Sequence, residues 1–117
     1  MGEEIYAPIM KKNQYLAVVC LLAGATSIYA QSPVAKGKAT FDQQCGLCHD
    51  PLTTEKKMGP GLKGLFKRPK LATTGKPTND ANVLEKINEG GNGMPPFTKE
   101  MLSDAEKGNL LAYLKTL

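Results

Sequence analysis

Residues 45–49 read Cys-Gly-Leu-Cys-His, and the interpretation of the whole chain depends on this stretch. A structural zinc site needs four Cys or His ligands, whereas beyond the N-terminal segment the chain offers only Cys45, Cys48 and His49. A thioredoxin-like pair of cysteines belongs in a strand–helix–strand context, and no strand pattern surrounds these residues. A disulfide between the two cysteines would leave His49 without a role.

Covalent attachment of a haem accounts for all three side chains. Two thiols three positions apart on one helical turn can add to the two vinyl groups along one edge of a porphyrin, and the next residue can then ligate the iron. We therefore expect one haem c, attached through Cys45 and Cys48, with His49 as an axial ligand.

The second axial ligand follows from the histidine count. His49 is the only histidine in the chain, so the thioether of a methionine is the expected partner. Met94 is favoured because it lies within Gly-Gly-Asn-Gly-Met-Pro-Pro-Phe (residues 90–97). The glycines allow backbone to approach a flat macrocycle, and the two prolines stiffen the chain directly after Met94. Met58 and Met101 remain the alternatives.

The N-terminal segment has the features of an export signal. Two lysines precede an apolar run over residues 15–30 that closes on small residues. We expect residues 1–30 to be a signal peptide cleaved near Ala30, with Met10 as the physiological start because two acids precede it. The run is shorter than the roughly 20 apolar residues of a membrane helix. A periplasmic domain of residues 31–117 without a permanent anchor is therefore expected, and an uncleaved anchor is the alternative.

Composition narrows the class of partner. The chain has 117 residues, a net charge of +4 and four Tyr and three Phe as its only aromatics. Nucleic-acid binding favours clustered Lys and Arg with stacking aromatics, and here the lysines are scattered, so no nucleic-acid partner is expected. The moderate positive charge instead favours an acidic protein surface. The candidate docking lysines are Lys56, Lys57, Lys63, Lys67 and Lys99.

Capping residues predict three helices. The first starts at Ser32 and Pro33 and runs to about Cys45. The second follows Asn79 and Asp80 and stops at the glycines of residues 90–91. A capping box of Ser103 and Glu106 opens the third.

Helical spacing predicts the buried faces of these helices. They comprise Val34, Gly37, Phe41 and Cys45 on the first helix, Val83, Leu84 and Ile87 on the second, and Leu110, Leu111, Tyr113, Leu114 and Leu117 on the third. The long Lys-, Gly-, Pro- and Thr-rich stretch of residues 50–78 is unusual for a free loop. It is expected of a chain wrapped around a prosthetic group.

Residues 59–68 read Gly-Pro-Gly-Leu-Lys-Gly-Leu-Phe-Lys-Arg, which is similar to the GPxLxGLFxR segment of mitochondrial-type cytochromes c. Over residues 31–117 the chain resembles a class I (monohaem) cytochrome c. The resemblance implies an all-α cytochrome c fold, with three main helices and loops wrapped around a covalently attached haem. The absence of Trp and the Met-Pro-Pro-Phe sequence are closer to compact bacterial members.

The resemblance also implies roles for individual residues. The Pro60 carbonyl would accept a hydrogen bond from Nδ1 of His49, Leu62 would pack on the haem, and Arg68 would lie near a propionate. Further candidates for propionate contacts are Lys70, Thr73 and Thr74. The first and last helices would cross where Gly37 and Phe41 meet Leu110 and Tyr113.

Ligation by His49 and Met94 would fill both axial positions of the iron. We therefore expect a periplasmic one-electron carrier rather than an enzyme, exchanging electrons with acidic-surfaced redox proteins such as a dehydrogenase or a terminal oxidase. The alternative is a tightly bound haem subunit of a periplasmic dehydrogenase, such as a sulfite-oxidising enzyme. A ligand-binding or peroxidatic haem, formed if Met94 dissociates readily, is a third interpretation.

Overall fold

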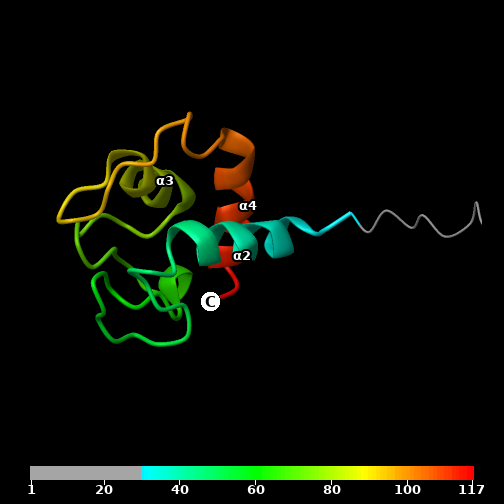
Figure 1. The fold of residues 1–117 in the computed structure, drawn as a ribbon. Helices are drawn as coiled ribbons and strands as arrows, with labels where there is room; N and C mark the ends of the chain where they lie inside the picture. The colour runs from blue at the N-terminus through cyan, green and yellow to red at the C-terminus, as the bar shows by residue number, and fades with distance from the viewer. Residues whose placement is uncertain (1–29) are drawn as a thin grey trace, which may run out of the picture. The chain divides into compact units, whose positions relative to one another are not determined.

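The computed structural model describes residues 30–117, and within them the regular structure is helical (Figure 1). The elements are α2 (Pro33–Gln44), the short 3-10 helix η1 (Leu65–Lys67), α3 (Asp80–Glu89) and α4 (Asp104–Leu114). Pairing between extended segments in this part of the chain is limited to two isolated bridges. The all-α prediction is confirmed. The expected signal peptide and the start at Met10 fall on residues outside the described range and stay predictions.

The three helices begin where the capping residues place them. The Ser32 hydroxyl accepts a hydrogen bond from the amide of Ala35 at 3.2 Å, and Pro33 occupies the first turn of α2. At α3 the N-cap is Asn79. Ser103 and Glu106 form the complete capping box of α4. These contacts lie within four residues of sequence, which is why the sequence alone predicts them.

Helices α2 and α4 cross in close contact and form the frame of the fold (Figure 1). Phe41 and Leu110 are each 1% exposed, and the rings of Phe41 and Tyr113 lie 5.4 Å apart at 58°. A Cβ atom on Gly37 would stand 1.9 Å from the carbonyl oxygen of Asn109. The predicted crossing is therefore present, and it requires a residue without a side chain at position 37.

The expected inner face of α2 needs one correction. Helical spacing predicts Val34 among the buried residues, but its side chain is 38% exposed. It lies in the first turn of the helix, ahead of the point at which α2 meets α4 at Gly37.

The crossing gives a matched pair of glycine substitutions. Gly37→Ala should destabilise the protein by about 1–3 kcal/mol, the usual cost of overpacking, because the new methyl group meets the backbone of α4. Gly108→Ala in α4 meets nothing within 4 Å and should stabilise by about 0.5–1 kcal/mol, as alanine does in a helix. Denaturant unfolding of both variants checks this. Equal effects of the two substitutions would contradict the close contact.

Helix α3 joins the frame through its inner face and through a buried lysine. Val83 and Ile87 are buried, and the Ile87 carbonyl accepts the amide of Phe97 at 2.9 Å. Lys107 of α4 is only 4% exposed, and its ammonium donates to the side chain of Asn88 at 2.7 Å. The sequence does not predict this polar link between α4 and α3, because no local pattern distinguishes Lys107 from the other lysines.

Residues 50–78 are irregular apart from η1, and they are tied back on themselves by backbone hydrogen bonds. Leu62 donates to the Asp50 carbonyl at 2.8 Å, and Lys63 donates to that of Thr53 at 3.1 Å. Leu65 and Leu71 bury their side chains in the core. None of the helices within residues 30–117 has the length and apolar character needed to span a bilayer.

Candidate functional site

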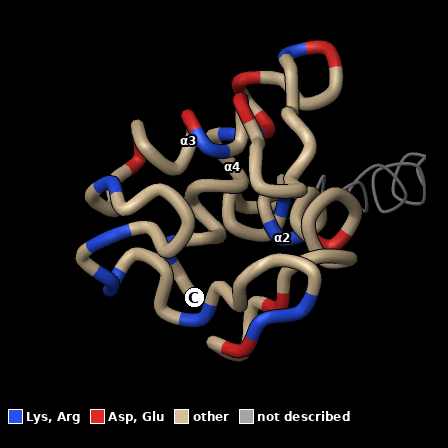
Figure 2. The backbone as a smooth tube through the Cα atoms, turned by 90° about the vertical axis from the view of Figure 1, so that its left-hand side faces the viewer, with Lys and Arg blue, Asp and Glu red and all other residues tan. Residues whose placement is uncertain are grey.

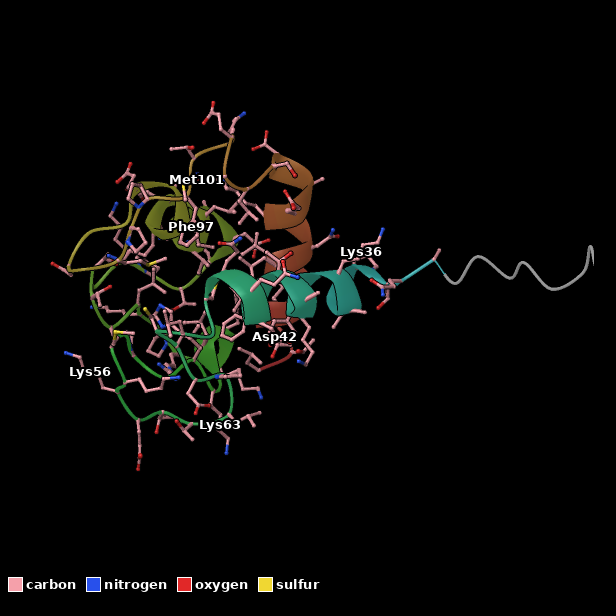
Figure 3. The ribbon with its side chains drawn as sticks, in the orientation of Figure 1. Lys36, Asp42, Lys56, Lys63, Phe97 and Met101 are labelled. Atoms are coloured by element: carbon pink, nitrogen blue, oxygen red, sulfur yellow. The ribbon has the colours of Figure 1, made fainter. Side chains whose placement is uncertain are left out.

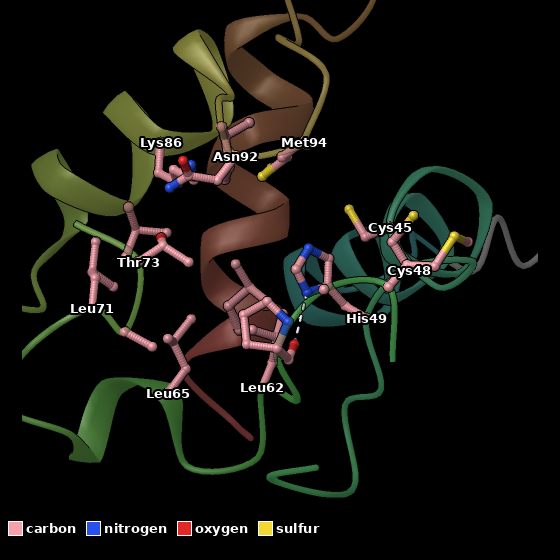
Figure 4. A pocket seen from close by; sticks show the side chains of 18 of the residues that line it. Cys45, Cys48, His49, Leu62, Leu65, Leu71, Thr73, Lys86, Asn92 and Met94 are labelled. Carbon is pink, nitrogen blue, oxygen red and sulfur yellow. Dashed lines mark hydrogen bonds between the residues drawn. The ribbon is translucent and has the colours of Figure 1, made fainter. Parts of the chain in front are cut away.

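The end of α2 places both cysteines and the histidine on one side of a cavity (Figure 4). The amide of Cys45 donates to the Phe41 carbonyl at 2.8 Å, which completes the last turn of the helix. The chain then turns tightly, and the amides of Cys48 and His49 both donate to the Cys45 carbonyl, at 3.1 and 2.9 Å. Both cysteines are half-buried and are not joined by a disulfide.

The imidazole of His49 is fixed by the segment over residues 59–60. Its Nδ1 lies 2.8 Å from the Pro60 carbonyl oxygen, and since a carbonyl can only accept, Nδ1 carries the proton and Nε2 is left with a lone pair. The Gly59 amide donates to the Cys48 carbonyl at 2.8 Å. A Cβ on Gly59 would lie 2.5 Å from Cε1 of the His49 ring. The contact between His49 and Pro60 that the family resemblance implied is present.

Gly59 belongs to the segment that resembles mitochondrial-type cytochromes c, but the resemblance assigned it no role. The structure shows that its lack of a side chain makes room for the His49 ring. The sequence feature that could have indicated this role is the position of Gly59 directly before Pro60, whose carbonyl orients the imidazole. A tertiary contact of this kind is visible only once residues 49 and 59 are known to meet.

Gly59→Ala should move the His49 ring away from Pro60. The added methyl group cannot fit 2.5 Å from the ring, so the Nδ1 hydrogen bond must lengthen, and overpacking should cost about 1–3 kcal/mol. NMR exchange of the Nδ1 proton with solvent should become faster, and the midpoint of thermal unfolding should fall.

Pro60→Ala is the control for this substitution, because it keeps the carbonyl oxygen that His49 uses. It should leave the exchange rate of the Nδ1 proton within about threefold of wild type, a change worth less than about 1 kcal/mol. Unchanged exchange in Gly59→Ala would contradict the packing described for the ring.

The cavity has a volume of about 330 Å³, within the roughly 300–1,000 Å³ of small-molecule and cofactor sites. Its walls include residues that also form the hydrophobic core, so it reaches into the fold, and the exposed residues Lys56 and Met58 line it as well. These core residues are Phe41, Leu65, Leu71, Val83, Ile87, Phe97, Leu110 and Leu114. Leu62, expected to pack on the haem, is also part of the wall.

Met94 enters the cavity from a hairpin that comes directly after α3 (Figure 4). The Gly91 amide donates to the Met94 carbonyl at 2.9 Å, and the Met94 amide donates to the Gly91 carbonyl at 3.2 Å. Residues 90–93 all have positive φ angles, of 65°, 97°, 55° and 87°. A two-residue hairpin with an Asn-Gly tip favours positive φ at both tip residues. The glycines therefore serve this turn, in addition to the close approach to a macrocycle expected from the sequence.

The other two methionines are placed differently. Met58 lines the cavity but is 66% exposed. Met58 directly precedes Gly59, which packs on the His49 ring. Met58 therefore belongs to the segment that contacts the histidine. Met101 does not line the cavity and is 55% exposed.

Three of the four residues suggested for contacts with haem propionates do not line the cavity. Arg68 donates to the carbonyl of Gly61 at 3.0 Å and also to that of Lys63, and it is not among the residues that line the cavity. Thr73 lines the cavity, whereas Lys70 and Thr74 do not. Arg68 thus braces the loop over residues 61–63, and its expected position near a propionate stays a prediction.

The thiol of Cys45 is poorly suited to exchange chemistry. Burial raises its pKa to about 11, and the nearby Cys48 adds to the shift. The thiolate is the reactive species in thiol–disulfide exchange, and the raised pKa keeps the Cys45 thiol largely protonated near neutral pH. Within residues 30–117, moreover, no three His, Cys, Asp or Glu side chains form a cluster suited to a metal ion. Both observations disfavour the thioredoxin-like and zinc interpretations.

The residues present fit a covalently attached haem. Two thiols and an imidazole with a free Nε2 stand along one wall of the cavity, and a thioether enters from another element. The cavity interrupts the core where an aromatic macrocycle would replace the missing contacts, and most of the side chains around it are apolar. This is the donor set and the environment that a c-type haem requires.

The fold and this site define a single-haem cytochrome c, an electron-transfer haem protein. Within that class, the chain belongs to the family described as "Cytochrome C oxidase, cbb3-type, subunit III", whose profile matches residues 32–114. The match runs from the N-cap of α2 to the last residue of α4.

Two curated proteins are similar to the chain. One is a cytochrome bc1 complex cytochrome c subunit of Corynebacterium diphtheriae, 29% identical over 83 residues, which are 71% of this chain and 27% of that protein. The other is the cbb3-type cytochrome c oxidase subunit CcoP of an Azospirillum species, 31% identical over 85 residues, 72% of this chain and 28% of that protein. The chain therefore spans less than a third of the length of these relatives.

Proposed function

We propose that this chain is a periplasmic one-electron carrier whose single haem c is attached through Cys45 and Cys48 and ligated by His49 and Met94. The observation that carries the proposal is the cavity itself, into which the two thiols, the imidazole and the Met94 thioether all project. When bound, the haem supplies a reversible one-electron iron couple. The chain's own residues hold it, orient its ligands and exclude water.

His49 is pre-oriented for ligation by its hydrogen bond to Pro60. Because the proton stays on Nδ1, the Nε2 lone pair is available to the iron, and the bond fixes the orientation of the ring. Gly59 limits rotation of the ring from one side. A histidine held in this way ligates without a large change in structure between redox states.

Met94 is the best-placed partner for the position opposite His49. It comes from a separate hairpin after α3 and is half-buried against the core. Met58 comes from the segment that packs on the His49 ring, which puts it on the same side as the histidine, and Met101 lies outside the cavity. If the chain supplied both axial ligands, the iron would have no open position for a substrate.

Replacement of Met94 tests the ligand set. Met94→Ala should erase the far-red absorption band of a ferric haem with thioether ligation and should lower the reduction potential, because Met ligation raises it. Spectroscopy and potentiometry of the purified protein measure both. Met58→Ala and Met101→Ala are the controls and should keep the band. Loss of the band in either control, with its retention in Met94→Ala, would reassign the ligand.

The second candidate function is that of a haem subunit held in a larger complex. It is favoured by the relatives, which are named as subunits of a bc1 complex and of a cbb3 oxidase. On this account the chain delivers electrons within an assembly, such as a periplasmic dehydrogenase or an oxidase, and does not diffuse between partners. Purification from native membranes and periplasm, with identification of co-purifying subunits, separates the two.

The surface beside the cavity suits a partner with an acidic rim and an apolar centre. Leu47 and Leu52 are 76% and 74% exposed, and Met58, which lines the cavity, is 66% exposed. Lys56 lines the cavity, and Lys57 donates to the Gly46 carbonyl at 3.1 Å, so both border the Cys-x-x-Cys-His segment. We infer that an acidic redox protein docks here.

The five candidate docking lysines do not form one ring. Basic positions lie in several separate segments of the fold (Figure 2). Lys56 and Lys63 lie toward one end of the described domain and Met101, near Lys99, toward the other (Figure 3). Lys99 is also paired with Asp104 at 2.9 Å. The docking surface is therefore assigned to the lysines of residues 56–63 and not to Lys99.

Neutralising the docking lysines should slow electron transfer in a salt-dependent way. Lys56→Gln with Lys57→Gln should lower the rate at which membranes of the source organism oxidise the reduced protein about two- to tenfold at low ionic strength. The difference should disappear at high salt, where charges are screened.

A double variant that removes the same charge elsewhere is the control for docking. Lys38→Gln with Lys99→Gln alters two lysines that are held in exposed ion pairs with Asp42 and Asp104. Its oxidation rate should match wild type. Equal slowing in both double variants would mean that net charge, and not this surface, determines docking.

A further inference from the structure

Lys86 reaches from the last turn of α3 to the base of the hairpin that carries Met94 (Figure 4). Its ammonium nitrogen lies 2.9 Å from the carbonyl oxygen of Gly90 and 2.9 Å from that of Gly91. The residue after it, Ile87, is buried in the core, so the backbone from which the side chain extends is firmly placed. Lys86 also lines the cavity into which Met94 projects.

The two carbonyls that Lys86 engages belong to the first two residues after α3. They lie just beyond the C-terminus of α3, where carbonyl groups lack helical partners and where the helix dipole favours a cation. The Gly91 carbonyl also accepts the Met94 amide at 3.2 Å. One oxygen atom thus receives hydrogen bonds from both the lysine and the methionine. A bond from an ammonium group is stronger than one between neutral groups.

The hairpin needs such support, because its backbone is unusual. Four consecutive residues hold positive φ angles, and Asn92 is the only residue of residues 30–117 other than glycine to do so. Glycine-rich segments lose much conformational freedom when they are ordered. The prolines after Met94 stiffen only the C-terminal side of the loop. On the N-terminal side, the described contacts from a side chain are those of Lys86.

Lys86 differs from the lysines that form ion pairs. The ion pairs of the described residues join Lys38, Lys76, Lys99 and Lys115 to acidic side chains. Lys86 directs its charge to two backbone carbonyls of one turn instead. This is the arrangement of a clamp on the backbone and not of a solvated surface charge.

We propose that Lys86 is a positioning residue for Met94: its ammonium clamps the hairpin of residues 90–94 to α3 and so keeps the thioether in the cavity. The inference rests on the proposed ligation by Met94. Without the clamp, the hairpin opens more often, and the thioether leaves the axial position more readily.

The test compares three lysine variants of the haem-loaded protein. Lys86→Met removes the ammonium and keeps the apolar stem, whereas Lys86→Arg keeps a cation that can donate to two carbonyls. Lys76→Met is the matched control, because it removes the same charge beside α3 from a lysine paired with Glu85 and leaves the hairpin untouched. Added imidazole, which competes with Met94 for the iron, is the probe.

Lys86→Met should bind imidazole in the ferric state about tenfold more tightly than wild type, because the hairpin loses its hydrogen bonds to a charged group. Lys86→Arg should stay within about threefold of wild type, and Lys76→Met should be unchanged. Wild-type affinity in Lys86→Met would overturn the clamp, and so would an equal increase in Lys86→Met and Lys76→Met.

A second measurement separates failure of the clamp from failure of the ligand assignment. In Lys86→Met, the amides of Gly91 and Met94 should exchange with solvent about tenfold faster, while amides in the middle of α3 should not change. Met94→Ala should itself increase imidazole affinity if Met94 is the ligand. No effect of Met94→Ala would refute the ligation, whereas unchanged amide exchange in Lys86→Met would refute the clamp whichever residue ligates.

Discussion

The hydrogen bond from Nδ1 of His49 to the Pro60 carbonyl is the interaction on which the site depends. It joins the turn after α2 to the irregular stretch that begins at residue 50. The Gly59 amide reinforces the junction by donating to the Cys48 carbonyl. Since these contacts are made within the polypeptide, the position of the ring is defined before any cofactor is considered. That preorganisation is what a redox centre needs, because a fixed ligand set changes little when an electron arrives or leaves.

The rest of the fold supports this junction from two sides. The crossing of α2 and α4 is closely packed and fixes the direction in which the Cys-x-x-Cys-His segment leaves α2. On the other side, α3 presents the hairpin that carries Met94, and Lys86 joins the two. The closely packed frame thus contributes one proposed axial ligand, His49, and the hairpin contributes the other, Met94. Because the hairpin is less firmly held than the crossing of α2 and α4, we expect ligation of the iron to be regulated at the hairpin.

Much of the fold could be predicted from the sequence because its determinants are local. Helix starts depend on side chains within four residues, so Ser32, Asn79 and Ser103 were sufficient to place α2, α3 and α4. The Cys-x-x-Cys-His segment likewise carries its chemistry within five residues, and the family match agrees with the class of protein that it indicated.

The features that the sequence did not predict depend on contacts between distant residues. Gly59 leaves space for the His49 ring, and Lys107 is buried against Asn88. Both contacts become visible only when separate segments are brought together. Arg68 donates hydrogen bonds to backbone carbonyls of its own loop, and no pattern of residue types predicts these partners. The exposure of Val34 depends on where two helices happen to meet.

Extraction of the purified protein with acidified acetone tests the central claim most directly, because it distinguishes a haem bonded to the polypeptide from one held by axial ligands alone. The account predicts that all of the haem stays with the polypeptide, and that replacing both Cys45 and Cys48 with serine releases it. Haem that passes into the acetone from the wild-type protein would contradict the account.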